Sequence, residues 1–251
     1  MDFNKIDELK AELNSIRSLY VLEMWRLRNE FIIENAYDSN AMEGNTLTFE
    51  ETENFLQKGI TSAEKATTNY IKLMGYKKAF EYITSIAEAD ILLTERIVKE
   101  IHSLVLMNDS TIKGIYRKAP VGISQGKNIL TEDYAVIRKM DTLIADYNEM
   151  KKNKHRIEAI AEFHLRFEGI RPFSDGNGRT NRLILNMGLM EAGLLPVNIR
   201  FEERQKYYDC FDNYHATGNN PEMLIELIAG YEMEELEKII KILKSKKRHK
   251  P

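Results

Sequence analysis

The stretch Arg171-Pro172-Phe173-Ser174-Asp175-Gly176-Asn177-Gly178-Arg179-Thr180-Asn181-Arg182 joins two amphipathic segments of the chain. Pro172 disfavours helical geometry at the residue before it, so we expect a helix over roughly residues 157–169 to end at Arg171. A second helix is expected to begin near Asn177 and to end before Gly193. The stretch is therefore predicted to form a loop between two helices.

The glycines and charged residues of this loop favour anion binding. Gly176 and Gly178 let the backbone bend tightly and approach a ligand, and successive N–H groups at a helix N-terminus form an anion cradle. Arg179 and Arg182 share a helix face, so both can reach phosphate oxygens. Asp175 is a hard oxygen ligand for Mg²⁺ already bound to phosphates. We therefore predict a nucleotide-phosphate site, with a plain helix–loop–helix turn as the alternative.

The rest of the 251-residue chain favours a mainly helical fold. Apolar residues make up 43% and charged residues 30%, and five prolines and thirteen glycines are too few for many short strands. Apolar residues at steps of three and four predict one long helix from Asp2 or Asn4 to about Phe31, with the pattern interrupted at residues 37–40. Further helices are expected at about residues 48–58, 62–87, 94–107, 201–216 and 221–247, and one from residue 132 onward.

One segment differs from these helical patterns. Residues 114–130 contain two short alternating runs around Gly126, which predict a small β-hairpin. The sequence has no internal repeat and no linker-like stretch. We therefore expect a single compact unit, in which an N-terminal helical extension over residues 1–50 packs on a core formed by residues 51–251.

Charge and cysteine content narrow the classes of function. A net charge of -3 and a pI near 6.0 argue against broad nucleic-acid binding. The basic tail at residues 241–250 is interpreted as a solvated helix end. Cys210 is the only cysteine, and no run of 18 apolar residues occurs, so neither an intramolecular disulfide nor a membrane span is expected. A cytoplasmic protein is the simplest interpretation.

The phosphate loop resembles the signature of the Fic family, H-x-F-x-(D/E)-G-N-G-R-x-x-R. The residues that match it are Phe173, Asp175, Gly176, Asn177, Gly178, Arg179 and Arg182. The resemblance covers about residues 35–230. It implies a compact helical Fic-type fold and the transfer of AMP from ATP to a protein hydroxyl, with Mg²⁺.

The resemblance also implies roles for individual residues. Gly176, Asn177 and Gly178 would hold the α- and β-phosphates, Asp175 the metal, and Arg179 and Arg182 the outer phosphates. Residues 114–130 resemble the flap on which members of the family register a target segment by strand addition. Tyr208 would line the adenine pocket.

The sequence departs from the signature at its first position. The family has a histidine there, which deprotonates the target hydroxyl, whereas this chain has Arg171. Arginine stays protonated in proteins and cannot act as a general base. His164 lies seven residues upstream, but its place on an inward-facing stripe favours a buried structural histidine. The resemblance therefore predicts an enzyme impaired at position 171, with some residual activity from positioning and charge.

The stretch Ser39-Asn40-Ala41-Met42-Glu43-Gly44-Asn45 resembles the family's inhibitory motif, S/T-x-x-x-E-G/N. Local capping explains Glu43 poorly, because a capping box places the acid three residues after the serine, where Met42 stands. By the resemblance, Glu43 pairs with Arg182 and blocks productive seating of the γ-phosphate. Ser39 and Glu43 are therefore predicted to be regulatory.

Three alternatives to an autoinhibited AMP transferase stay open. The cradle could serve a non-catalytic nucleotide sensor, or the site could remove AMP from a modified protein. A DNA-binding regulator is a distant alternative, because no basic recognition helix stands out. The sequence names neither the protein target nor the oligomeric state, for which a homodimer is one option.

Overall fold

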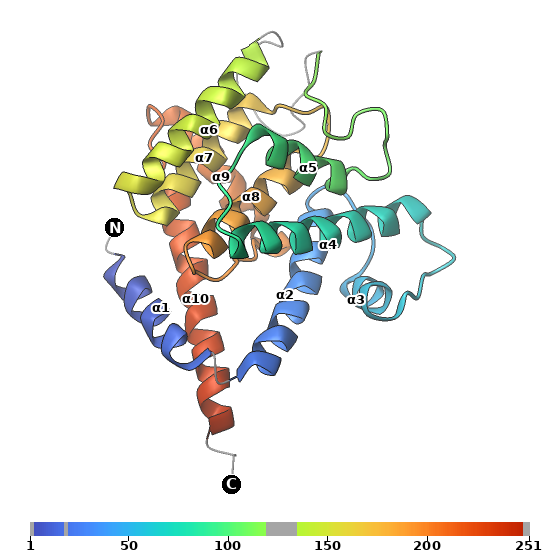
Figure 1. The fold of residues 1–251 in the computed structure, drawn as a ribbon. Helices are drawn as coiled ribbons and strands as arrows, with labels where there is room; N and C mark the ends of the chain where they lie inside the picture. The colour runs from blue at the N-terminus through green and yellow to red at the C-terminus, as the bar shows by residue number, and fades with distance from the viewer. Residues whose placement is uncertain (1–2, 18–19, 119–134, 248–251) are drawn as a thin grey trace.

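The computed structural model describes residues 3–17, 20–118 and 135–247. Within these ranges the chain forms ten α-helices, the short 3-10 helix η3 and no β-strand (Figure 1), so the predicted mainly helical fold is confirmed. The elements are α1 (Asn4–Arg17), α2 (Val21–Ala41), α3 (Phe49–Lys58), α4 (Thr67–Glu88), α5 (Glu95–Val105), α6 (Val136–Asn153), α7 (Arg156–Ile170), α8 (Asn177–Glu191), η3 (Phe201–Glu203), α9 (Arg204–Ala216) and α10 (Glu222–Lys247).

Helix α8 lies at the centre of the molecule, packed against α4, α5 and α7 (Figure 1). Every residue from Leu183 to Leu189 is buried, and a helix that is buried all round belongs to the core. Gly188 allows this close packing, since a Cβ there would lie 2.6 Å from Tyr147 Oη and 3.0 Å from Ile160 Cδ1. The core thus fixes the position of α8. It thereby also fixes the end of the loop over residues 171–176, called the glycine loop below, which leads into this helix.

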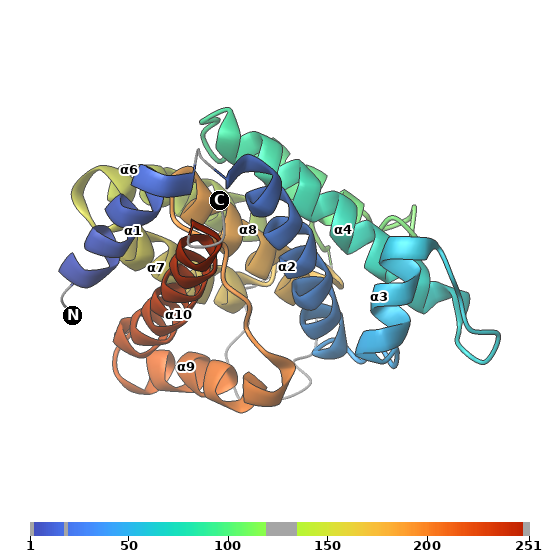
Figure 2. The same cartoon turned by 90° about the horizontal axis from the view of Figure 1, so that it is seen from below.

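The predicted long N-terminal helix is two helices, which corrects the sequence-based expectation. Helix α1 packs on α10, whereas α2 packs on α4 (Figure 2). Leu9 and Leu13 are buried on α1, and Ile32 and Ile33 are buried on α2. The regular apolar spacing is therefore divided between two different partners, and spacing alone does not reveal a change of partner.

The expected interruption at residues 37–40 is also wrong, because α2 continues to Ala41. The polar side chains there have tertiary partners instead of local ones. Asp38 accepts hydrogen bonds from Asn198 Nδ2 at 2.6 Å and from the Phe201 backbone N–H at 3.0 Å. Such contacts override the weak helix propensity of Asp, Ser and Asn. Ser39 consequently lies inside a helix and not in a turn.

The remaining helices follow the predicted ranges closely. Helix α4 begins at Thr67 rather than near Ser62, and α3 begins with a capping box between Thr48 and Glu51.

The predicted hairpin at residues 114–130 lies largely outside the described residues, and residues 114–118 form no strand. It therefore stays a prediction. None of the described helices has both the length and the apolar character needed to cross a membrane.

Candidate functional site

The glycine loop connects the end of α7 to the start of α8, as predicted. Arg171 caps α7 in the left-handed conformation (φ 44°), and Gly176, with φ 72°, precedes the first turn of α8. The side chain of Asn177 closes the loop by accepting from the Phe173 N–H at 2.9 Å and donating to the Phe173 carbonyl at 2.7 Å. The side-chain amide of Asn177 is therefore occupied inside the loop.

Arg179 is a buried cation with unused donors. Its side chain is 1% exposed, and its Nη2 atom lies 3.6 Å from Asp175 Oδ2. Among the described residues, Arg179 Nε and Nη1 have no hydrogen-bond partner. The carboxylate of Asp175 is 57% exposed and accepts from the Gly176 N–H at 2.6 Å. Open donors beside an exposed carboxylate and a helix N-terminus suit a phosphate group together with a cation.

Arg182 faces the end of α2 and is bonded there through Nε and Nη2. Its Nε donates to Ser39 Oγ at 2.9 Å, and its Nη2 donates to the Ser39 carbonyl at 3.0 Å and to Glu43 Oε1 at 2.9 Å. The structure thus brings Ser39, Glu43 and Arg182 together. Ser39 contacts the guanidinium directly, which sequence reasoning missed because it placed this serine in a turn.

The Glu43 carboxylate lies against the first turn of α8. A Cβ atom at Gly178 would stand 2.5 Å from Glu43 Oε1 and 3.0 Å from Arg182 Nη1. Gly178 therefore makes room for the ion pair between these two side chains. In consequence, Glu43 places a negative group at the N-terminal end of α8, beside the backbone that was predicted to hold phosphates.

At the position of the family's histidine, Arg171 forms an ion pair with Glu168, one turn earlier on α7. Burial raises the pKa of the Glu168 carboxyl, and the Arg171 charge opposes that rise. The carbonyl of Arg171 accepts from Arg117 Nε at 2.8 Å, and the carbonyl of Pro172 accepts from the Arg117 N–H at 2.8 Å. These contacts fix the backbone at position 171 while its guanidinium is neutralised by Glu168.

His164 is placed in the interior and not at the loop surface. Its ring is fully buried, and its Nε2 lies 2.7 Å from the hydroxyl oxygen of Tyr207. Burial lowers the pKa of His164 to about 3. A ring enclosed in this way cannot reach the hydroxyl of a target protein. Tyr208, the predicted adenine contact, is half-buried on α9 next to Tyr207.

Two further residues of the site were missed by the sequence reasoning. Tyr76 of α4 is buried, donates to Asn35 Oδ1 at 2.7 Å and is hydrogen-bonded to Ser39, so it supports the α2 end of the site. His102 of α5 is buried beneath the loop, stacked on Phe173. Both are ordinary inward-facing positions of helical patterns, and no local motif distinguishes them.

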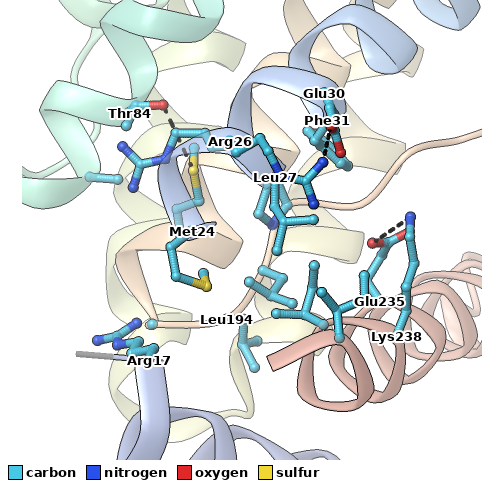
Figure 3. A pocket seen from close by; sticks show the side chains of 18 of the residues that line it. Arg17, Met24, Arg26, Leu27, Glu30, Phe31, Thr84, Leu194, Glu235 and Lys238 are labelled. Carbon is cyan, nitrogen blue, oxygen red and sulfur yellow. Dashed lines mark hydrogen bonds and ion pairs between the residues drawn. The ribbon is translucent and has the colours of Figure 1, made fainter. Parts of the chain in front are cut away.

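A separate cavity of about 490 Å³ lies at the other end of α2 (Figure 3). Met24, Leu27 and Phe31 of α2, with Leu194 and residues of α10, form its lining. From α8 it takes Met190, which is thirteen residues, or about 20 Å, from the helix start at Asn177. This cavity is therefore distinct from the glycine loop.

Comparisons with known proteins find similarity to one family. The profile of the Fic/DOC family matches residues 92–189. A protein adenylyltransferase Fic of Nematostella vectensis is 34% identical over 211 residues, which cover 82% of this chain and 48% of that protein. The protein of the same name from Aedes aegypti is 28% identical and is covered to 42%. The chain thus spans about half the length of these curated relatives.

Solved structures with the same fold cover nearly the whole chain. A Fic domain containing signaling protein from Bacteroides thetaiotaomicron has a TM-score of 0.89 at 26% identity, covering 96% of this chain and 97% of the other. Fic-1 from C. elegans has a TM-score of 0.84 at 24% identity, covering 97% of this chain and 72% of that one, and supports the fold alone. The arrangement of helices around α8 is therefore shared with solved proteins.

Proposed function

This chain belongs to the Fic/DOC family, and on that premise we propose that it is a protein adenylyltransferase restrained by its own Glu43. The observation that carries the proposal is the bond from Arg182 Nη2 to Glu43 Oε1 at 2.9 Å, beside Gly178. The reaction would transfer AMP from ATP to a Ser, Thr or Tyr hydroxyl of a target protein, with release of pyrophosphate.

The loop would hold ATP by its phosphates. Residues 177–178 lie in the first turn of α8, where backbone N–H groups have no partner within the helix, and the open donors of Arg179 are charged and buried, where hydrogen bonds to phosphate are strong. Tyr208 would lie against the adenine. These residues would bind and orient the nucleotide.

Asp175 is the residue that would hold Mg²⁺. Asp175 offers one exposed carboxylate. That arrangement fits Mg²⁺, which is commonly bound through one or two carboxylates together with substrate phosphates. The ion would neutralise part of the charge that the phosphates carry.

Glu43 would restrain the enzyme by occupying Arg182. A γ-phosphate and a carboxylate cannot both approach one guanidinium closely without repulsion, so ATP would be seated in a non-productive pose. The remaining cradle would still hold the other phosphates. We therefore propose that Glu43 affects the geometry of bound ATP more than its affinity, and that the first 50 residues form an extension carrying this control.

Arg171 limits the proposed activity. General-base help is worth about 10² to 10⁴ in rate, and an arginine cannot supply it. Positioning and charge stabilisation by Arg179, Asp175 and the backbone would remain. We propose a slow transferase as the chain stands, with the target segment docked on residues 114–130.

Intact-protein mass measurement after incubation with ATP and Mg²⁺ tests this function. The chain, Arg171→His and the double variant Arg171→His/Glu43→Gly would be compared, first for self-modification and then with lysate proteins and labelled ATP. AMP addition, a mass gain of about 329 Da, should be greatest in the double variant. The proposal fails if the double variant binds ATP and transfers no AMP to itself or to any lysate protein.

The ion pair between Arg171 and Glu168 favours a second candidate, a nucleotide sensor without transferase activity. In that case calorimetry would detect ATP binding while all three proteins keep their mass. Removal of AMP from a modified target is a third candidate, which a preparation of AMP-modified substrate would reveal by mass loss. A homodimer is compatible with each of these and is tested by light scattering.

A further inference from the structure

His102 connects the phosphate loop to Gly114, the first residue of the predicted flap. Its Nε2 atom lies 2.9 Å from the carbonyl oxygen of Asp175, and its Nδ1 accepts from the Gly114 N–H at 2.8 Å. The imidazole stacks on Phe173 at a centroid distance of 3.6 Å and an interplanar angle of 3°. The ring is buried, and nothing in the proposed function yet uses it.

The two hydrogen bonds determine the tautomer of His102. The Gly114 N–H can only donate, so Nδ1 must be unprotonated. The carbonyl of Asp175 can only accept, so Nε2 must carry the proton. A ring that carries a proton on Nε2 and none on Nδ1 is neutral. The imidazole therefore has one donor and one acceptor, and both are used by backbone groups.

The bond to Asp175 determines which way the next peptide N–H points. In a trans peptide the C=O and the following N–H point in opposite directions. Because His102 holds the Asp175 carbonyl toward the interior, the Gly176 N–H is turned away from the interior. That N–H donates to the Asp175 carboxylate at 2.6 Å, so in this structure it already faces a negative group.

The loop has little freedom to shift on the ring. A Cβ atom at Gly176 would lie 3.4 Å from His102 Nε2 and 3.3 Å from Leu106 Cγ and Cδ2. Stacking on Phe173 fixes the ring from a second side. The Asp175–Gly176 peptide is thus held by a hydrogen bond, by a stacked ring and by close packing.

We infer that His102 is a positioning residue of the phosphate loop, which orients the Asp175–Gly176 peptide so that the Gly176 N–H is presented to a nucleotide phosphate. The inference rests on the proposed nucleotide site. His102 touches no substrate, and it acts through the backbone of Asp175. Because the Gly114 N–H fixes its tautomer, the root of the predicted flap also supports the phosphate site.

Two substitutions separate the two hydrogen bonds. His102→Asn places an acceptor near the position of Nδ1 and loses the donor to Asp175, whereas His102→Gln extends a donor toward Asp175 and loses the acceptor near Gly114. Both lose the ring stacked on Phe173, so that loss cancels in their comparison. Ile97→Val, a buried change five residues earlier on α5, is the control for general destabilisation of that helix.

Calorimetry with MgATP should give a dissociation constant about fivefold to tenfold higher for His102→Asn than for His102→Gln, the usual contribution of one hydrogen bond. Their unfolding temperatures should fall by similar amounts, and Ile97→Val should bind MgATP as the parent chain does. Equal dissociation constants for the two His102 variants would overturn the inference.

A spectroscopic measurement on the unaltered chain covers the case in which the variants do not fold. The imidazole ¹⁵N spectrum at pH 7 should show His102 neutral, with the proton on Nε2. A proton on Nδ1, or a protonated ring, would overturn the inference even if MgATP binds. If the parent chain binds no MgATP while the Nε2–H tautomer is found, the proposed nucleotide site fails and the structural role of His102 stands alone.

Discussion

Arg182 Nη2 lies 2.9 Å from Glu43 Oε1, although 139 residues separate them in the sequence. This ion pair connects the residues that follow α2 to the first turns of α8, directly after the glycine loop. Ser39 strengthens it with two more acceptors, its hydroxyl and its carbonyl. The Arg182 guanidinium, which we propose receives the γ-phosphate, is thereby bonded to residues of the chain itself.

We expect Glu43→Gly to raise AMP transfer about tenfold or more in an Arg171→His background, because Arg182 becomes available to the γ-phosphate. Ser39→Ala should raise it less, since the Ser39 carbonyl and Glu43 still hold the guanidinium. Intact-protein mass spectrometry over time measures both rates. Unchanged transfer in the Glu43→Gly double variant would show that the acid does not restrain the enzyme.

Arg171→His should increase AMP transfer by at least about tenfold, a floor below the usual range for a general base. The backbone suits the change, because position 171 has φ 44° and histidine is among the residues enriched in this conformation. Arg171→Asn is the matched control, as it tolerates the same backbone and offers no base. Equal rates for the two variants would place the base elsewhere.

Arg179→Ala should weaken MgATP binding about 10- to 100-fold, the range for lost hydrogen bonds from a charged group. The donors Nε and Nη1 are unused among the described residues, so the substitution removes ligand contacts more than internal ones. Calorimetry gives the dissociation constant. The control is Arg166→Ala, whose side chain bonds Asp146 at 2.7 Å and does not contact the loop. Unchanged affinity in Arg179→Ala would refute the phosphate site.

Gly178→Ala should destabilise the protein by about 1 kcal/mol, because the new Cβ would lie 2.5 Å from Glu43 Oε1 and this side-chain end would move aside at the cost of its bond to Arg182. In a Glu43→Gly background the same substitution should cost less, since only the 3.0 Å contact with Arg182 remains. A double-mutant cycle of urea unfolding curves measures this coupling. Strictly additive costs would mean that Glu43 does not occupy this position in solution.

Glu232→Gln should stabilise the protein more at pH 8 than at pH 5. Burial raises the pKa of Glu232 to about 8 from its usual 4.5, so between these values the folded protein keeps a proton that the unfolded chain releases. Stability is consequently lost as the pH rises through this window. In the parent chain the Leu195 N–H donates to Glu232 Oε1 at 2.9 Å, and the oxygen of the glutamine side chain can still accept this hydrogen bond.

Thermal unfolding at both pH values tests this, and the advantage of Glu232→Gln should grow by about 3 °C or more between pH 5 and 8. The exposed Glu237→Gln on the same helix is the control and should show no such trend. An advantage that is equal at both pH values would indicate that Glu232 titrates normally in the folded protein.

The local features of the site could be predicted from the sequence because they depend on neighbouring residues. Pro172 ends one helix, Gly176 supplies a positive φ, and the next helix begins at Asn177, as the structure has it. The periodic apolar spacing likewise determined most helix ranges. Each of these depends on backbone geometry within a few residues, so the sequence pattern carries the information.

Only the tertiary structure decided which groups meet around that loop. Contacts with segments far away in the chain determine three of these features. They are the division into α1 and α2, the helical state of Ser39, and the hydrogen bond between His102 and the Asp175 carbonyl. By itself, a polar residue such as Asp38 favours a turn. It is accommodated in a helix here because Asn198 donates a hydrogen bond to its carboxylate. Such choices leave no local trace in the sequence, because the free energy that determines them comes from packing.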